Sequence, residues 1–285
     1  MVEKGERVRE DWGLIPASLE DARMLHRISL TVLAALALSC AATPPAITGR
    51  VVEEDFVSAT VGDTYQLVVR LPPGYDDSSD VYPVLVQLDA LQSGGQFNIT
   101  AGHASELASE GAIPEIIVVG VGGGDRFRDF TVDGVEAFLR FLREELLPHV
   151  DATYRTDAAA GRALFGHSLG GFFSLYTLLS TGAEASPPFT AFVAADPSLT
   201  EGDVRLLSLE DELSASTTEL PRRLYFPIAR YNGAVQRLYF DELSDRLDAN
   251  YTGLDLRAEV LETDHGGAVD PSYADGLRFV FGGVP

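Results

Sequence analysis

From residue 50 onward, short apolar runs alternate with longer stretches in which apolar side chains recur every three or four positions. The apolar runs at 84–89 and 116–120 are typical of strands buried on both faces of a sheet. The stretch 135–148 instead carries its apolar side chains along one helical stripe. This repeated alternation predicts a mostly parallel sheet with helices on both faces.

The first two strands are expected to differ from the rest. Residues 51–59 and 65–71 are predicted to form an antiparallel N-terminal hairpin, which ends at the turn 72–75. Further strands are predicted at 164–165, 189–195, 223–228 and 256–261, and further helices at 169–180, 235–249 and 272–281. In such a sheet the functional site lies beyond the carboxyl ends of the parallel strands.

The N-terminal region has the pattern of a secretory signal peptide. A short basic start precedes an apolar run at 28–38, which is too short for a stable membrane span. Residues 37–40 (ALSC) then resemble a bacterial lipobox, with Cys40 as the lipidated residue. The pattern favours a lipoprotein over simple secretion, in which Cys40 would be inert.

These features divide the chain into four segments. We expect residues 1–23 to lie upstream of the true start at Met24, 24–40 to be the signal peptide and 41–49 to be a tether. Residues 50–285 then form a single catalytic domain. The predicted location is the bacterial cell envelope, as a periplasmic or outer-membrane lipoprotein. Membrane contact is expected only through a lipid at Cys40.

Composition narrows the choice of partners. The chain has 285 residues, of which 46% are hydrophobic and 22% charged, as expected for a globular protein with a sizeable core. Its formal net charge of −22 repels phosphate backbones, so nucleic-acid binding is not expected.

The motif with the clearest chemistry is Gly166-His167-Ser168-Leu169-Gly170. It follows a strand-like run and opens an apolar helix, which is the context of the G-x-S-x-G nucleophile elbow. The tight turn raises the serine hydroxyl clear of the sheet at a helix N-terminus, whose dipole favours a developing oxyanion. Ser168 is therefore the predicted nucleophile.

A serine nucleophile needs a base, and the chain order in this arrangement is serine, acid, histidine. His265 is the only histidine after Ser168, and it lies in a glycine-rich loop behind the last predicted strand. We therefore predict His265 as the base. His167, next to the nucleophile, is expected to have a packing role.

Several segments, together with the elbow, resemble the putative esterase family of α/β-hydrolases. This branch contains the enterochelin (ferric siderophore) esterases and the S-formylglutathione hydrolases. The resemblance is carried by the runs 72–75 (PPGY), 82–89 (YPVLVQLD), 137–146 (AFLRFLREEL), 154–156 (YRT), 165–171 (FGHSLGG), 264–266 (DHG) and 276–279 (GLRF). It implies an α/β-hydrolase fold over residues 50–282 and ester chemistry.

The resemblance also implies further site residues. The oxyanion hole would combine the backbone N–H of Leu169 with that of Ala90 or Leu91, after the strand ending at Asp89. The stretch that contains Arg126 and Arg128 matches a family segment. We interpret it mainly as a structural ion-pair turn, with a contact between Arg126 or Arg128 and an anionic substrate group as the alternative.

The sequence departs from the family pattern at the acid. Relatives carry Glu or Asp after the penultimate strand, where this chain has Ala229-Arg230-Tyr231-Asn232-Gly233. Three alternatives stay open. Asp196, after the preceding strand, could serve as the acid, although Asp196-Pro197-Ser198 is also a plain turn sequence. Asn232 could orient the imidazole without charge, or the enzyme could use a Ser–His dyad.

Together these residues predict a serine esterase that cleaves a small-molecule carboxylic ester through an acyl-enzyme. A siderophore-esterase-like or feruloyl-esterase-like enzyme fits the resemblance. Two alternatives are an acyltransferase of the same fold and a non-catalytic, surface-anchored binding protein. The sequence implies no cofactor and no metal, since no close His/Asp spacing suits a metal ion.

Overall fold

The computed structural model describes residues 43–92, 96–157, 159–201 and 203–283. The predicted signal peptide, with Met24 and Cys40, lies outside the described residues. The compact unit is Pro44–Pro285, which is described here by itself. Among the described helices we find none whose length and apolar character would allow it to cross a bilayer.

The centre of this unit is a sheet of eight strands in the order β1-β2-β4-β3-β5-β6-β7-β8. The strands are β1 (Arg50–Ser58), β2 (Asp63–Leu71), β3 (Val84–Gln87), β4 (Ile117–Gly123), β5 (Arg162–His167), β6 (Ala191–Ala195), β7 (Arg223–Ala229) and β8 (Asp255–Leu261). Only β1–β2 and β2–β4 pair antiparallel, and β3 to β8 are mutually parallel. The predicted α/β-hydrolase fold is therefore confirmed.

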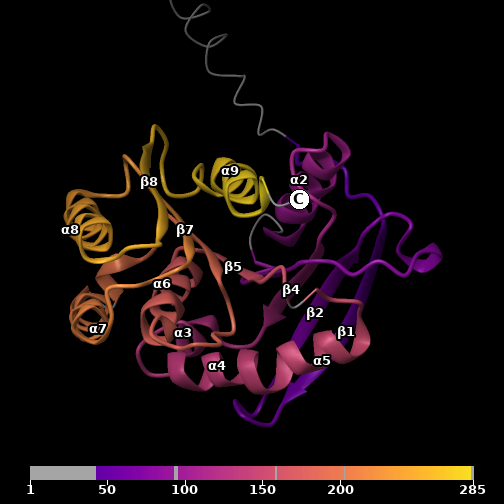
Figure 1. The fold of residues 1–285 in the computed structure, drawn as a ribbon, viewed down its shortest axis with the longest axis horizontal. Helices are drawn as coiled ribbons and strands as arrows, with labels where there is room; N and C mark the ends of the chain where they lie inside the picture. The colour runs from indigo at the N-terminus through magenta and orange to yellow at the C-terminus, as the bar shows by residue number, and fades with distance from the viewer. Residues whose placement is uncertain (1–42, 93–95, 158, 202, 284–285) are drawn as a thin grey trace, which may run out of the picture. The chain divides into compact units, whose positions relative to one another are not determined.

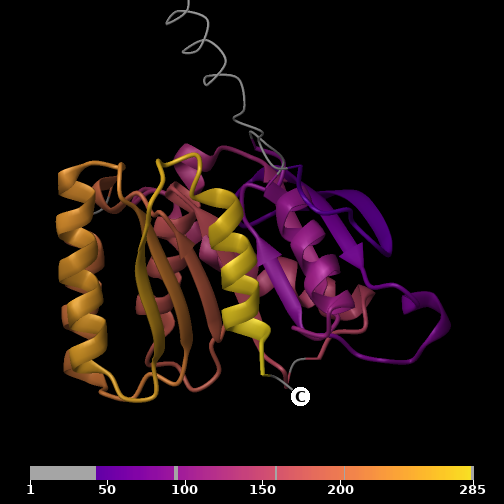
Figure 2. The ribbon, with the colours of Figure 1, turned by 90° about the horizontal axis from the view of Figure 1, so that it is seen from above.

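Helices cover both faces of the sheet (Figures 1 and 2). They are α2 (Gln96–Ser109), α3 (Arg126–Asp129), α4 (Val135–Phe141), α5 (Leu147–Thr153), α6 (Leu169–Thr181), α7 (Asp203–Ser216), α8 (Ala234–Asn250) and α9 (Val269–Phe281). Helices α2 and α9 pack on one face with one apolar cluster, while α4, α6, α7 and α8 pack on the other. Every residue of β3 and β6 is buried, as expected for strands between two helical layers.

The helix predicted at 135–148 runs further than expected. It continues through a π-helical segment, Leu142–Leu146, into α5, which ends at Thr153. Pro148 stands just after the π-helical segment, in the first turn of α5. Helices α2 and α7 were not predicted, and α7 is on average slightly polar, so it lacks a long apolar run that would mark it.

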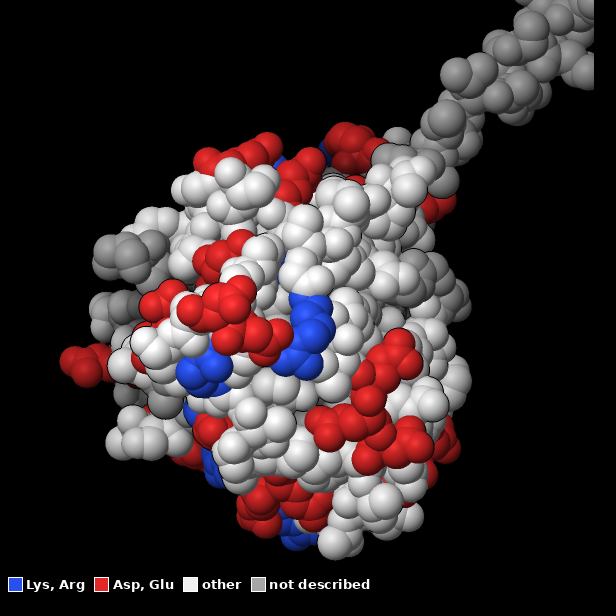
Figure 3. All heavy atoms as spheres, turned by 90° about the vertical axis from the view of Figure 1, so that its right-hand side faces the viewer, with Lys and Arg blue, Asp and Glu red and all other residues white. Residues whose placement is uncertain are grey.

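The acidic composition is visible on the molecular surface. The face shown in Figure 3 carries more Asp and Glu side chains than Lys and Arg. Such a surface repels polyanions.

Candidate active site

Ser168 occupies a sharp turn between β5 and α6. Its backbone has φ +60° and ψ −119°, a conformation that is strained for a residue with a side chain. A Cβ on Gly166 would lie 2.2 Å from the Gly170 carbonyl oxygen, so the turn requires glycine there. The strand, turn and helix that the elbow motif predicts are therefore all present.

Asp196 and His265 meet beside this turn. Asp196 follows β6, the neighbour of β5, and its side chain is fully buried. The Asp196 Oδ2 atom lies 2.6 Å from His265 Nδ1. Because a carboxylate accepts, Nδ1 carries the proton and Nε2 is left as the basic nitrogen. The catalytic role of this pair stays a prediction.

Asp196 and Asn232 make different contacts around His265. Asn232 donates to Asp196 Oδ2 over 3.0 Å, and the Ala229 backbone N–H donates to Oδ1 over 2.8 Å. The buried carboxylate thus has a donor at each oxygen besides the imidazole, which offsets its loss of water. Asn232 and His265 share the Oδ2 atom of Asp196, and within the described part of the chain no hydrogen bond joins Asn232 to the imidazole. This arrangement supports Asp196 over Asn232 as the orienting group.

The Ser168 hydroxyl lies 3.1 Å from the hydroxyl of Ser198. Ser198 also donates its backbone N–H to the Ser168 carbonyl over 2.9 Å, so it holds the elbow from the β6 side. Within the part of the chain that the structure describes, no hydrogen bond joins Ser168 to His265. Catalytic hydrogen bonds of this kind often tighten only when substrate is bound. Nothing in the sequence pattern marked Ser198 beyond its place two residues after Asp196.

His167 does more than the expected packing. It is buried, its Nε2 donates to the His265 carbonyl over 2.9 Å, and the two rings are 4.4 Å apart. Burial and the nearby His265 imidazole lower the pKa of His167 to about 4. A neutral His167 therefore anchors the loop of His265 without adding a second charge to the site.

The structure contradicts the prediction of Ala90 as an oxyanion-hole donor. The Ala90 N–H donates to the Val121 carbonyl over 3.1 Å, because the chain just after β3 stays hydrogen-bonded to β4, in which Val121 lies. Ala90 is therefore not free to stabilise an oxyanion. Among the described residues, the N–H groups of Leu91 and Leu169 have no backbone or side-chain acceptor. Leu91, the other predicted donor, takes the place of Ala90.

Arg128, the predicted alternative for substrate binding, is engaged in structural ion pairs. Its Nε lies 2.6 Å from Asp129 and its Nη2 lies 3.0 Å from Asp63. Two carboxylates already neutralise this guanidinium, so the ion-pair interpretation fits it better than a substrate contact. Arg126 forms a two-pronged pair with Asp89, with distances of 2.8 and 2.9 Å.

One group of side chains has a spacing that could suit a metal ion. The potential ligand atoms of His167, Asp196 and His265 lie within 4.8 Å of one another. Their wide separation along the chain concealed this from sequence reasoning. A metal ion would have to break the short hydrogen bond between Asp196 and His265, so the contacts of these residues fit a hydrogen-bonded cluster better than a metal site.

Comparison with known proteins shows what this part of the chain is similar to. Residues 58–184 match the family described as "Putative esterase". The match covers less than half of the chain. It contains Leu91, Arg126 and the Ser168 elbow, whereas Asp196 and His265 follow it.

Three relatives illustrate the family. Ferri-bacillibactin esterase BesA of Bacillus subtilis is 29% identical over 41% of this chain and 48% of its own length. Siderophore enterobactin esterase of Emericella nidulans is 26% identical over 52% and 56%. The chain thus spans about half the length of these curated relatives. An IroE-like serine hydrolase from Shewanella oneidensis is 26% identical, with a TM-score of 0.74 over 81% of this chain and 80% of its own.

Proposed function

We propose that this protein is a serine esterase that hydrolyses small-molecule carboxylic esters by two-step acyl transfer. The observation that carries the proposal is the buried Asp196–His265 pair next to the strained Ser168 turn. Strain at a non-glycine residue persists only when surrounding structure holds it, and it gathers at functional sites. The named esterases among the relatives support the same chemistry.

In the first step Ser168 attacks the ester carbonyl while His265 Nε2 takes its proton. Asp196 keeps the imidazole in the required tautomer and stabilises it once it is charged. The N–H groups of Leu169 and Leu91 receive the oxyanion. His265 then protonates the leaving alcohol and activates water, which releases the acid and restores Ser168.

Siderophore-like and feruloyl-like esters are the first substrates to test, because relatives with the same fold carry those names. A chromogenic ester series of increasing acyl length, with ferric and iron-free siderophore esters beside it, would define the class. A fluorophosphonate probe should label Ser168 in wild type. Failure of every ester and of the probe would reject the proposal.

We further propose that the protein is exported and held at the cell envelope by a lipid on Cys40, on the basis of the apolar run and lipobox-like residues 37–40. A bacterial lipoprotein carries more than one acyl chain, which is enough for stable anchoring. Wild type should sediment with membranes and Cys40→Ser should not. Recovery of mature wild type wholly in the supernatant, without lipid, would reject this part.

A further inference from the structure

Three residues other than glycine have a positive φ in the described part of the chain. They are Asp89 (φ 53°), Ser168 (φ 60°) and Asp196 (φ 39°). They follow β3, β5 and β6, so all three lie at the same edge of the sheet. Ser168 and Asp196 have roles in the proposed mechanism. Asp89 is equally strained and as yet has none.

Asp89 is also a buried charge. Only 3% of its surface is exposed, and both its oxygens accept from Arg126, through Nε at 2.8 Å and Nη2 at 2.9 Å. A two-pronged pair of this kind fixes orientation as well as charge. The hydrogen bond to Asp89 raises the pKa of Arg126 above its usual value, so this guanidinium stays charged.

The position of Asp89 links it to the oxyanion hole. Its carbonyl accepts from the Gln92 N–H over 3.0 Å, which closes a turn around Ala90 and Leu91. Its carboxylate lies against the first turn of α6, since a Cβ on Gly170 would be 3.2 Å from Asp89 Oδ2. Asp89 thus adjoins both proposed donors, Leu91 through its backbone turn and Leu169 through the α6 turn that its carboxylate contacts.

We propose that the Asp89–Arg126 pair is a positioning device that holds the Leu91 N–H in line with the oxyanion formed at Ser168. This inference rests on the proposed esterase function. Arg126 forces the backbone of Asp89 into its strained conformation and cancels a negative charge that would otherwise oppose the oxyanion. Neither side chain needs to touch the substrate.

A rival role for Arg126 is direct contact with an anionic substrate group, because 22% of its side chain is exposed. The two roles predict different kinetics. An oxyanion donor acts mainly in the transition state, so its displacement lowers kcat and leaves KM nearly unchanged. A substrate contact changes KM, and only for anionic esters.

The test compares Arg126→Lys and Asp89→Asn with wild type on a neutral chromogenic ester and on an anionic analogue. Lysine keeps the charge and loses the two-pronged geometry. We expect kcat to fall about ten- to a hundredfold for both esters, with KM within about threefold. Asp89→Asn/Arg126→Gln, which leaves no unpaired charge in the core, should fall no further than the single variants.

Arg162→Lys is the matched control, because this arginine is similarly shielded and pairs with Asp151 at 2.5 Å at the opposite edge of the sheet. Its kcat should stay within about twofold of wild type. Unchanged kcat in folded Arg126→Lys and Asp89→Asn, or a rise in KM confined to the anionic ester, would overturn the positioning role. An inactive wild type would instead refute the proposed function, so the two failures are distinct.

Discussion

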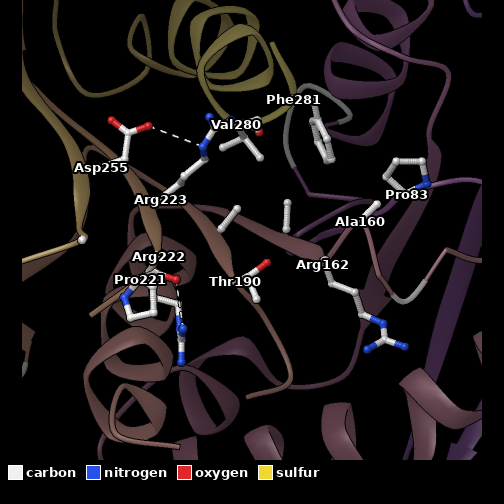
Figure 4. Close-up of a pocket in the computed structure, with 14 residues that line it drawn as sticks. Pro83, Ala160, Arg162, Thr190, Pro221, Arg222, Arg223, Asp255, Val280 and Phe281 are labelled. Atoms are coloured by element: carbon white, nitrogen blue, oxygen red, sulfur yellow. Dashed lines mark hydrogen bonds and ion pairs between the residues drawn. The ribbon is translucent and has the colours of Figure 1, made fainter. Parts of the chain in front are cut away.

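The two edges of the parallel sheet carry polar residues of very different character. At the carboxyl edge, the turns after β3, β5 and β6 hold strained residues and N–H groups without acceptors. At the amino edge, the same strands begin beside a cavity of about 350 Å³ (Figure 4). A cavity of this size would by itself suggest a ligand site at the amino edge.

The arginines around that cavity bind the ends of helices. Arg222 donates to the carbonyls of Gly182 and Glu184, just beyond α6, at 3.4 and 3.2 Å. Arg223 donates to the Val280 carbonyl in the last turn of α9 at 2.9 Å and pairs with Asp255 at 3.4 Å. Last-turn carbonyls lack helical partners, so these arginines satisfy them.

The difference shows what marks a reactive site in this fold. Side chains at the amino edge are committed to backbone groups and stabilise the structure. At the carboxyl edge, Ser168 and Asp196 keep costly conformations, and the N–H groups of Leu91 and Leu169 stay available. Strain and available donors therefore indicate chemistry here better than volume does.

The largest predicted effect comes from removing the nucleophile. Ser168→Ala should lower kcat by about 10⁶ with the fold intact, because no other group can form the acyl-enzyme. Ester hydrolysis and fluorophosphonate labelling would measure it, with circular dichroism as the folding control. Turnover within tenfold of wild type would remove the carboxyl edge from the mechanism.

The next effect separates the three possibilities for the acid. Asp196→Asn should lower kcat by about 10⁴, mostly without a change in KM, because the carboxylate stabilises His265 once the ring is charged. Asn232→Ala removes one of several hydrogen bonds to Asp196 and should cost less than about tenfold.

Other outcomes are equally clear. If Asn232→Ala were the damaging change, Asn232 would be the orienting group. If both variants stayed within about tenfold while His265→Ala was inactive, the enzyme would use a dyad.

The sequence predicted the fold well because burial on both faces leaves a simple pattern. Apolar runs marked β3, β4 and β7 to within about three residues at each end. The elbow was also predictable, since its glycines are required by local sterics at Gly166. Helix α7 was not, because its apolar residues are few and tertiary packing decides its position.

The rest of the site depends on neighbours in space. Which of Asp196 and Asn232 reaches His265 follows from the lengths of the turns after β6 and β7, which no residue pattern encodes. The family resemblance implied Ala90, just after β3, as an oxyanion-hole donor. Its N–H instead donates to the carbonyl of Val121 on the adjacent strand β4. The pairing of Asp89 with Arg126, 37 residues apart, was likewise invisible.

A smaller effect concerns stability at the carboxyl edge. Protonation of His167 is penalised in the folded state, where its pKa is about 4, relative to 6.5 when unfolded. The unfolded chain therefore binds more protons between these values, and stability falls as pH drops from 6.5 to 4, by about 3 kcal/mol in full. Glutamine in His167→Gln can still donate to the His265 carbonyl but does not titrate. The free energy of unfolding of this variant should therefore fall less than that of wild type between pH 6.5 and 4.

Urea unfolding at pH 7, 5 and 4 would measure the difference between the two proteins. Comparing wild type with the variant cancels the contribution of other titrating groups. Parallel stability curves for the two proteins would contradict the buried, neutral state assigned to His167.

The smallest effect tests the amino edge directly. Arg223→Met keeps most of the side-chain length but removes the donor to Val280 and the pair with Asp255. We expect a loss of about 1 kcal/mol in the free energy of unfolding, since a cation at a helix C-terminus and one hydrogen bond are each worth about that much. The kcat should stay within about twofold of wild type, because the lost contacts lie at the opposite ends of the strands from Ser168.

Thermal unfolding and ester turnover measured on the same preparation would separate the two quantities. A fall in kcat of tenfold or more without unfolding would mean that the amino edge takes part in the reaction, and the contrast between the two edges would fail.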